Sequence, residues 1–211
     1  MRQALVIFAV LSLVAFVLQC DEKKPDETNF EDPDRFFPVN FKYEWTYVDL
    51  GPGCVVAERD TWVVAARTRT TRTVEGVSHN GWDLQLLTGG QSTGFRYRVK
   101  DTIFYWNDVS YPEQPPYKVL VGPVKAGTNW KDRDVYGHEY FIVGIEDYYS
   151  AVMNYTFNRC ARVKRTTSGD NRVWYYWWAP GWGKVGQAQY QAEQCLDGAE
   201  LKRLYRDPDY P

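Results

Sequence analysis

Four cysteines mark the positions where this sequence most clearly points to chemistry. Cys20 follows an apolar run, residues 4–18, that is interrupted only by Ser12, and it precedes a strongly charged segment, residues 21–27. A short cationic start, an apolar run and a polar junction together form an export signal. A cysteine at such a junction is a candidate for lipid acylation. The sequence therefore predicts a signal peptide over residues 1–19, with Cys20 as the lipid-anchored first residue of the mature chain.

Two alternatives to a lipid anchor remain open. Gln19 is a poor fit to the small residue that usually precedes a lipidated cysteine, so a general signal peptidase could instead release a secreted protein. An uncleaved membrane anchor is less favoured, because the apolar run is shorter than the roughly 20 residues that a spanning helix needs. We expect an exported protein of the cell envelope, attached to a membrane through Cys20, with simple secretion as the alternative.

The remaining cysteines, Cys54, Cys160 and Cys195, are disulfide candidates. In an exported protein they allow one disulfide and leave one thiol over, and the sequence does not say which two pair. No two of them have the close spacing of a zinc knuckle or a redox dithiol. We therefore expect no zinc site and no thioredoxin-like activity.

Two further motifs resemble cofactor sites but lack an essential part. Residues 181–186 match the glycine pattern of dinucleotide-binding loops, but residues 185–190 alternate like a strand where that site needs a helix. Residues 132–137 open like a calcium loop, yet Val143 stands where such a loop needs a bidentate glutamate. We expect a hairpin turn at the first motif, no metal and no cofactor.

Catalysis and nucleic-acid binding are both disfavoured. The only two histidines, His79 and His138, lie in no metal-binding or nucleophile motif. We therefore predict no catalytic residues and no enzymatic activity. The chain has 25 basic and 27 acidic residues, so no broad basic field exists to attract nucleic acid.

The most unusual local feature is the aromatic run over residues 174–178. On a strand, its first, third and fifth side chains share one face. Such a face can form the wall of an apolar ligand pocket or a flat platform for a sugar, or simply pack in a core. The candidate ligand-binding residues are the three side chains of this face, Trp174, Tyr176 and Trp178, and also Trp182, which follows the next turn.

The elements that must position these residues are nearly all strands. Residues 41–47, for example, alternate between aromatic and polar side chains, the period of a half-buried strand. Helix is conceivable only at residues 31–36 and 200–205. We expect strands over residues 41–47, 61–70, 73–78, 82–88, 94–100, 102–106, 118–121, 139–148, 155–166, 172–179, 184–193 and 199–206. Turn signals separate them at Asn80-Gly81, Gly89-Gly90, Ser168-Gly169-Asp170 and Pro180-Gly181.

This pattern predicts an all-β protein with a single domain of mostly antiparallel strands, arranged as a curved sheet, a half-barrel or a sandwich. The domain should span residues 37–211, behind an acidic tether over residues 20–36. Pro38-Val39 stands seven residues before Trp45, and Pro123-Val124 stands seven before Trp130. The repeated spacing suggests two related halves.

The chain resembles a set of bacterial envelope lipoproteins of unassigned function. Residues 177–185 are similar to that family's Y-W-Y-A-P-G-V-G-x-V motif, and the two Pro-Val…Trp segments resemble its P-L-x-x-G-x-x-W motif. Residues 140–147 and 157–163 resemble two strands that lie between these motifs. The likeness runs from about residue 37 to 185, although Phe41 replaces a glycine of the family pattern.

This resemblance implies a curved antiparallel sheet, akin to periplasmic carriers of lipoproteins and lipids, and it implies no catalytic residues. We accordingly expect a non-enzymatic cell-envelope lipoprotein that binds an apolar envelope ligand or a partner protein. The alternative is a secreted carbohydrate-binding domain that uses the same aromatic side chains.

Overall fold

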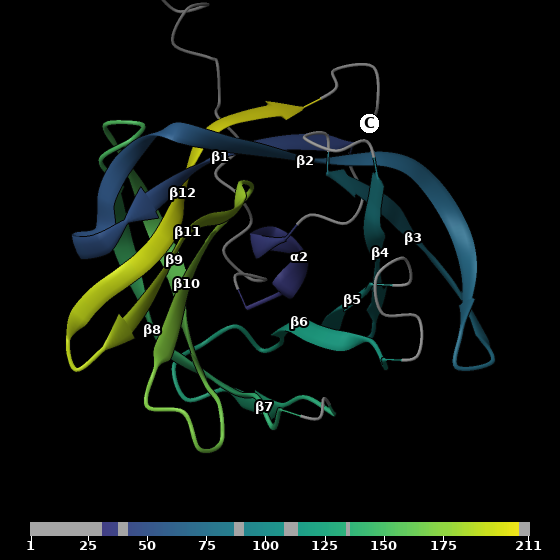
Figure 1. The fold of residues 1–211 in the computed structure, drawn as a ribbon. Coiled ribbons are helices and arrows are strands. Elements are labelled where there is room, and N and C mark those ends of the chain that lie inside the picture. Colours follow the sequence, from purple (N-terminus) through teal and green to yellow (C-terminus); the bar gives the residue numbers. More distant parts are fainter. Residues whose placement is uncertain (1–30, 38–41, 87–90, 108–113, 134–135, 207–211) are drawn as a thin grey trace, which may run out of the picture. The chain divides into compact units, whose positions relative to one another are not determined.

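The computed structural model describes residues 31–37, 42–86, 91–107, 114–133 and 136–206. These residues form one unit that begins at Glu31 and consists almost entirely of strands (Figure 1). The prediction of a single all-β domain is therefore confirmed. The predicted signal peptide, Cys20 and the first part of the predicted tether lie outside the described residues.

Twelve antiparallel strands form a single sheet. In chain order they are β1 (Tyr43–Gly51), β2 (Val55–Val74), β3 (Val77–Leu86), β4 (Gln91–Val99), β5 (Thr102–Trp106), β6 (Tyr117–Val121), β7 (Asn129–Lys131), β8 (Glu139–Ser150), β9 (Tyr155–Thr166), β10 (Val173–Ala179), β11 (Gly183–Gln191) and β12 (Gln194–Arg206). The short helices α2 (Pro33–Phe36) and η2 (Pro52–Cys54) complete the described structure.

The sheet is a meander in two runs, β1 to β6 and β7 to β12, that join where β1 pairs with β12. Its two edge strands, β6 and β7, approach each other without a backbone ladder. Lys118 of β6 donates its amide hydrogen to Oδ1 of Asp132 at 2.9 Å and accepts a 3.2 Å hydrogen bond from the Trp130 indole. We call this junction of β6 and β7 the seam; it leaves a nearly closed, barrel-like sheet.

The two tryptophans of the repeated sequence spacing occupy matching places in the two runs. Trp45 lies in β1 and Trp130 in β7, the first strand of each run, and both side chains are buried. Each indole donates to a backbone carbonyl, Trp45 to Trp182 at 2.7 Å and Trp130 to Lys118 at 3.2 Å. This arrangement agrees with the predicted two halves, although residues 38–41 of the first copy lie outside the described residues.

One predicted turn is wrong. Asn80-Gly81 lies within β3, and the hairpin turn between β2 and β3 is instead Glu75-Gly76, whose φ angles of 49° and 81° suit a type I′ turn. The glycine at position 81 serves packing: a Cβ there would lie 2.2 Å from the Arg96 carbonyl oxygen and 2.7 Å from the Phe95 ring. The predicted strand over residues 73–78 is therefore wrong, because the hairpin turn falls within it, and β2 instead continues through residues 71–72 to Val74.

Other turn predictions are confirmed. Ser168-Gly169-Asp170 connects β9 to β10, and Pro180-Gly181 connects β10 to β11. The dinucleotide-like glycine pattern is thus a hairpin turn followed by a strand. Gly89-Gly90 lies outside the described residues.

Of the two stretches that could hold a helix, residues 31–36 do and residues 200–205 belong to β12. Asp32 caps α2 by accepting from the Asp34 amide at 2.9 Å, and Pro33 opens the helix.

The helix lies inside the curve of the sheet (Figure 1), where Phe36 is fully buried. Arg98 of β4 forms ion pairs with Asp32, at 3.0 Å, and with Asp34. Residues 31–36 therefore belong to the folded unit, and the predicted tether boundary at residue 36 moves toward the N-terminus.

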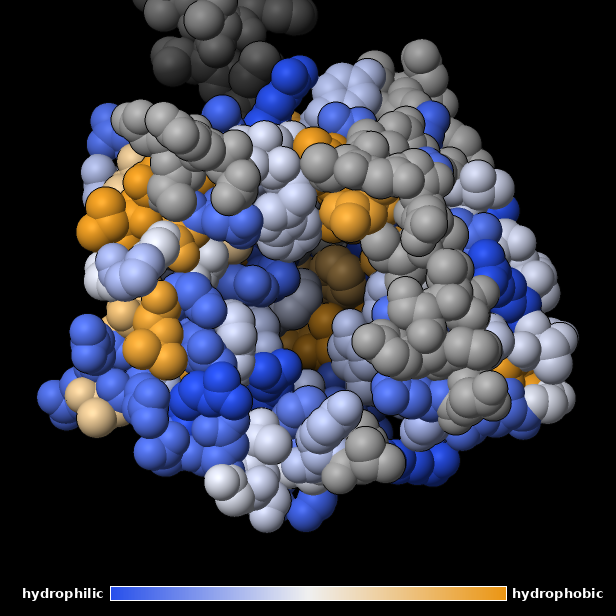
Figure 2. Space-filling model, in the orientation of Figure 1, coloured by the Kyte–Doolittle hydropathy of each residue, from blue (hydrophilic) through white to orange (hydrophobic). Residues whose placement is uncertain are grey.

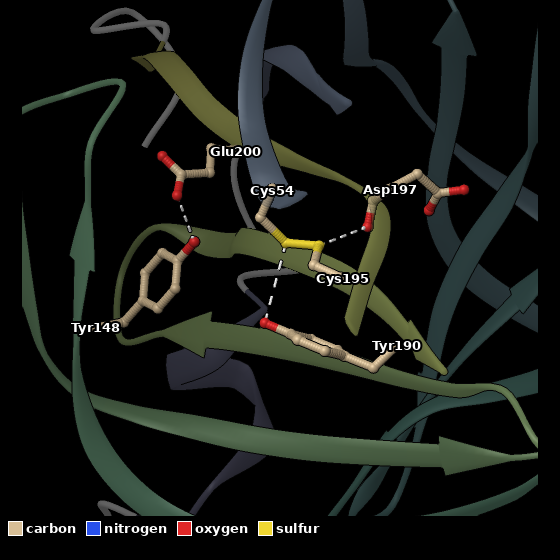
Figure 3. Close-up of a disulfide and its surroundings, with 6 residues drawn as sticks. All are labelled: Cys54, Tyr148, Tyr190, Cys195, Asp197 and Glu200. Atoms are coloured by element: carbon tan, nitrogen blue, oxygen red, sulfur yellow. Dashed lines mark hydrogen bonds between the residues drawn. A yellow bond between two sulfur atoms is a disulfide. The ribbon is translucent and has the colours of Figure 1, made fainter. Parts of the chain in front are cut away.

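A disulfide joins Cys54 of η2 to Cys195 of β12, with the Tyr190 hydroxyl 3.9 Å from Cys54 Sγ (Figure 3). Cys160 is the remaining thiol of the predicted set. It is buried, and burial raises its pKa to about 12, so it is a poor nucleophile at neutral pH.

None of the helices in the described ranges has both the length and the apolar character needed to cross a membrane.

Candidate functional site

The candidate site is built on the concave faces of β9, β10 and β11. The alternation of β10 places Trp174, Tyr176 and Trp178 on one face, as the sequence predicts. Pairing with β9 sets Trp174 opposite Arg165 and Tyr176 opposite Val163. An arginine thus enters the aromatic face from the neighbouring strand.

A β-bulge adds a lysine to the same face. In the β10–β11 pair, Tyr176 lies opposite Gln187, but Trp178 lies opposite Lys184, because Val185 is an extra residue in β11. Gln187 and Lys184 are three residues apart and would point to opposite faces of a regular strand. The bulge brings them together, and Lys184 Nζ donates a 2.5 Å hydrogen bond to Gln187 Oε1.

Two adjoining cavities occupy the interior of the sheet. The seam cavity, about 450 Å³, lies beside the seam, and its lining includes Tyr117, Asp132, His138, Tyr140, Arg165 and Tyr176. The core cavity, also about 450 Å³, has a lining that includes Trp45, Tyr47, Trp62, Val64, Leu84 and Leu86. Both are bounded by Tyr117, Val119, Trp178 and Lys184. Figure 2 shows a hollow at the centre of the face that is turned toward the viewer, with apolar atoms at its floor.

Lys184 stands at the boundary between the two cavities and is surrounded by aromatic rings. Its Nζ lies 5.4 Å from the ring centroid of Tyr47, 5.6 Å from that of Trp62 and 6.0 Å from that of Tyr176. These contacts favour the ammonium form through cation–π attraction. Burial opposes them, and together with the positive charge of Arg165 it lowers the pKa of Lys184 to about 8.

Arg165 is the second cation of the site. Its guanidinium lies 5.2 Å from the ring centroid of Trp174 and 5.7 Å from that of Tyr176, and its buried Nε has no hydrogen-bond partner. Burial raises the pKa of the Tyr176 phenol to about 12, so this ring stays neutral at physiological pH. Within the described ranges, neither Arg165 nor Lys184 forms an ion pair with a carboxylate. The site is therefore an aromatic pocket whose lining has more basic than acidic side chains.

The structure brings together only part of the predicted ligand wall. Tyr176 and Trp178 line the cavities, whereas Trp174 stacks on Tyr176 at 6.2 Å outside the lining. Trp182 lies elsewhere and packs edge-on against Phe157 at 5.1 Å. Trp178 is buried, and the other three are half-buried, so these four side chains do not form an exposed flat platform.

Sequence reasoning missed Arg165, Lys184 and Trp62 as members of the site. The alternation of β9, which buries Ala161 and Val163, could have placed Arg165 on the inner face. No local pattern could have placed Lys184 there, because its orientation depends on the bulge.

The described side chains do not suggest a metal centre. No group of three metal-ligating residues clusters within the described ranges. Asp132, the first residue of the calcium-like motif, instead accepts the Lys118 amide hydrogen at Oδ1, at 2.9 Å. Its carboxylate therefore holds β6 to the end of β7 at the seam.

No protein-family model and no curated protein matches this chain. Two solved structures are similar to it. One, from Bacteroides fragilis, is named as an exported protein with a YmcC-like fold; the alignment covers 81% of this chain and 98% of that one, with 12% identity and a TM-score of 0.48. The other, named as a lipoprotein of Parabacteroides distasonis, aligns over 81% of this chain and 98% of that one, with 14% identity and a TM-score of 0.43.

Proposed function

We propose that this protein is a non-enzymatic binding protein of the cell envelope that holds an apolar molecule inside its curved sheet. The observation that carries the proposal is the pair of adjoining interior cavities, each about 450 Å³, that share Trp178 and Val119 in their walls. Protein sites for small ligands are typically concave, mostly apolar and about 300–1,000 Å³ in volume. Each cavity falls within that range.

The sequence supports a location in the cell envelope. An export signal ending at Cys20 directs the chain out of the cytoplasm, and acylation of Cys20 would hold the sheet close to a membrane. Apolar molecules of the envelope are then the ligands within reach. Burial of Trp178 argues against the rival function, a surface platform for sugars, because that platform needs exposed coplanar rings.

A cavity-filling substitution tests the proposal. The neutral fluorophore N-phenyl-1-naphthylamine becomes bright in apolar surroundings, so its titration reports binding to the purified protein. Val119→Phe adds a ring to the wall between the two cavities, and we expect it to weaken dye binding at least about tenfold. Val77→Phe, on the exposed β2–β3 hairpin where Val77 is 56% exposed, is the matched control and should bind like the wild type.

Circular dichroism and the melting temperature of both variants establish that they are folded. Equal binding by wild type and a folded Val119→Phe variant would overturn the proposal, because the dye would then be bound elsewhere.

A further inference from the structure

We propose that the ligand is a single-chain amphiphile with an anionic head group, held with its head between Lys184 and Arg165 and its chain in the core cavity. This inference rests on the proposed function and adds the chemical class of the ligand. It starts from the difference in polarity between the two cavities.

The core cavity is suited to an alkyl chain. Aromatic and aliphatic side chains line it, among them Trp45, Trp62 and Leu84, and Lys184 is the one charged residue in its lining. That lysine stands at the boundary with the seam cavity. An apolar chain placed in the core cavity would therefore end at an ammonium group.

The seam cavity is lined by a second cation, Arg165, as well as by Lys184. Arg165 and Lys184 lie 5.7 Å and 6.0 Å from the centroid of the same Tyr176 ring, and Arg165 contributes to the lowered pKa of Lys184. Two like charges in a partly desolvated site repel each other, and an anion between them would relieve that repulsion. The buried Nε of Arg165, which has no partner, is a donor available to such an anion.

Other charges of the seam cavity do not neutralise this pair. Lys118 adds a third basic side chain to the lining, and Asp132 is the one carboxylate in it. The Oδ1 atom of Asp132 already accepts the Lys118 amide hydrogen. The lining thus keeps an excess of positive charge, which selects for an anionic head over a neutral or cationic one.

The test compares ligands that share a chain and differ in the head group. Palmitate carries a carboxylate, hexadecyl phosphate a phosphate, and hexadecanol no charge. Displacement of N-phenyl-1-naphthylamine from the purified full-length protein measures all three. We expect at least one anion to bind about tenfold or more tightly than hexadecanol, as suits a charge-assisted contact. The better anion identifies the head group.

Matched variants connect the preference to the two cations. Lys184→Met and Arg165→Met should each reduce anion affinity about tenfold and leave hexadecanol within about twofold of wild type. Lys164→Met is the control, since Lys164 neighbours Arg165 on β9 but lines a different hollow beside Phe141. It should keep the anion preference.

The outcomes separate the two proposals. If neither the dye nor any of the three chains binds, the proposed function fails. If hexadecanol binds as tightly as both anions, or if the preference survives in both folded methionine variants, cavity binding stands and the anionic head group is overturned.

Discussion

Lys184 lies opposite Trp178 across the β10–β11 pair, although Gln187, three residues further along β11, lies opposite Tyr176. The extra residue is Val185, which is fully buried. In a regular strand the Lys184 side chain would point away from the cavity. The bulge reverses its direction, so that Lys184 forms part of the cavity wall. The result is an ammonium group held among Tyr47, Trp62 and Tyr176.

Lys184→Met should stabilise the protein at neutral pH. Burial lowers the pKa of folded Lys184 to about 8, below the ordinary value of 10.5. Below pH 8 the lysine is charged in both states, and the full cost of burying it is present. Between pH 8 and 10.5 the unfolded chain binds the proton and the folded chain does not, so wild-type stability rises with pH. Methionine removes the cost, and we expect a gain of about 1–3 kcal/mol at pH 7 that shrinks toward pH 10.

Urea unfolding of both proteins at pH 7 and 9.5 measures this gain. Burial raises the pKa of Tyr176 to about 12 and also raises that of Tyr47, so neither of these two phenols titrates between pH 7 and 9.5. Lys202→Met, at an exposed position of β12, should show no such pH dependence. A gain that is equal at both pH values would contradict the buried-lysine account.

Loss of the disulfide should destabilise the protein strongly. Cys54 and Cys195 are separated by 141 positions, and closing so long a loop removes much conformational entropy from the unfolded chain. We expect the double variant Cys54→Ser/Cys195→Ser to lose about 2–5 kcal/mol. Dithiothreitol should lower the melting temperature of wild type and of Cys160→Ala, and leave that of the double variant unchanged. An equal response of all three to the reductant would be evidence against this disulfide.

Gly81→Ala should be far more costly than Gly144→Ala. A Cβ at position 81 meets the Arg96 carbonyl oxygen at 2.2 Å, whereas a Cβ at position 144 meets nothing within 4 Å. Overpacking of a buried site costs about 1–3 kcal/mol and occasionally more. We therefore expect Gly81→Ala to lower the free energy of unfolding by about 3 kcal/mol or more. Alanine at the open site should be neutral or gain up to about 1 kcal/mol. Thermal unfolding compares the two, and similar losses at both sites would refute the packing role of Gly81.

Asp132→Ala should loosen the seam. The change removes the acceptor of the Lys118 amide hydrogen of β6. Hydrogen exchange of β6 should then accelerate at least about tenfold, since the lost hydrogen bond is worth about 1.5–3 kcal/mol. Amides of the β1–β12 pair should exchange as before. Asp132→Asn keeps an acceptor oxygen and should lie close to wild type; acceleration spread evenly over the sheet would instead indicate global destabilisation.

Local patterns predict much of this fold because they depend on neighbouring residues alone. The alternation of β1 correctly buries Tyr43, Trp45 and Tyr47. Turn signals succeed where the chain does reverse, as at Pro180-Gly181. The turn signal at Asn80-Gly81 fails because glycine is also required inside a strand where a neighbouring strand leaves no room for a side chain. At position 81, Phe95 and Arg96 of β4 occupy that space.

The sequence by itself determines the all-β class, the presence of enough cysteines for one disulfide, and the aromatic face of β10. Only the tertiary structure decides that Cys54 pairs with Cys195, that β6 and β7 meet at a seam, and that Lys184 and Arg165 share one cavity with Tyr176. These features depend on which strands pair and in what register. A single extra residue in one strand reverses the direction of every side chain beyond it, and that residue is recognised only when its partner strand is known.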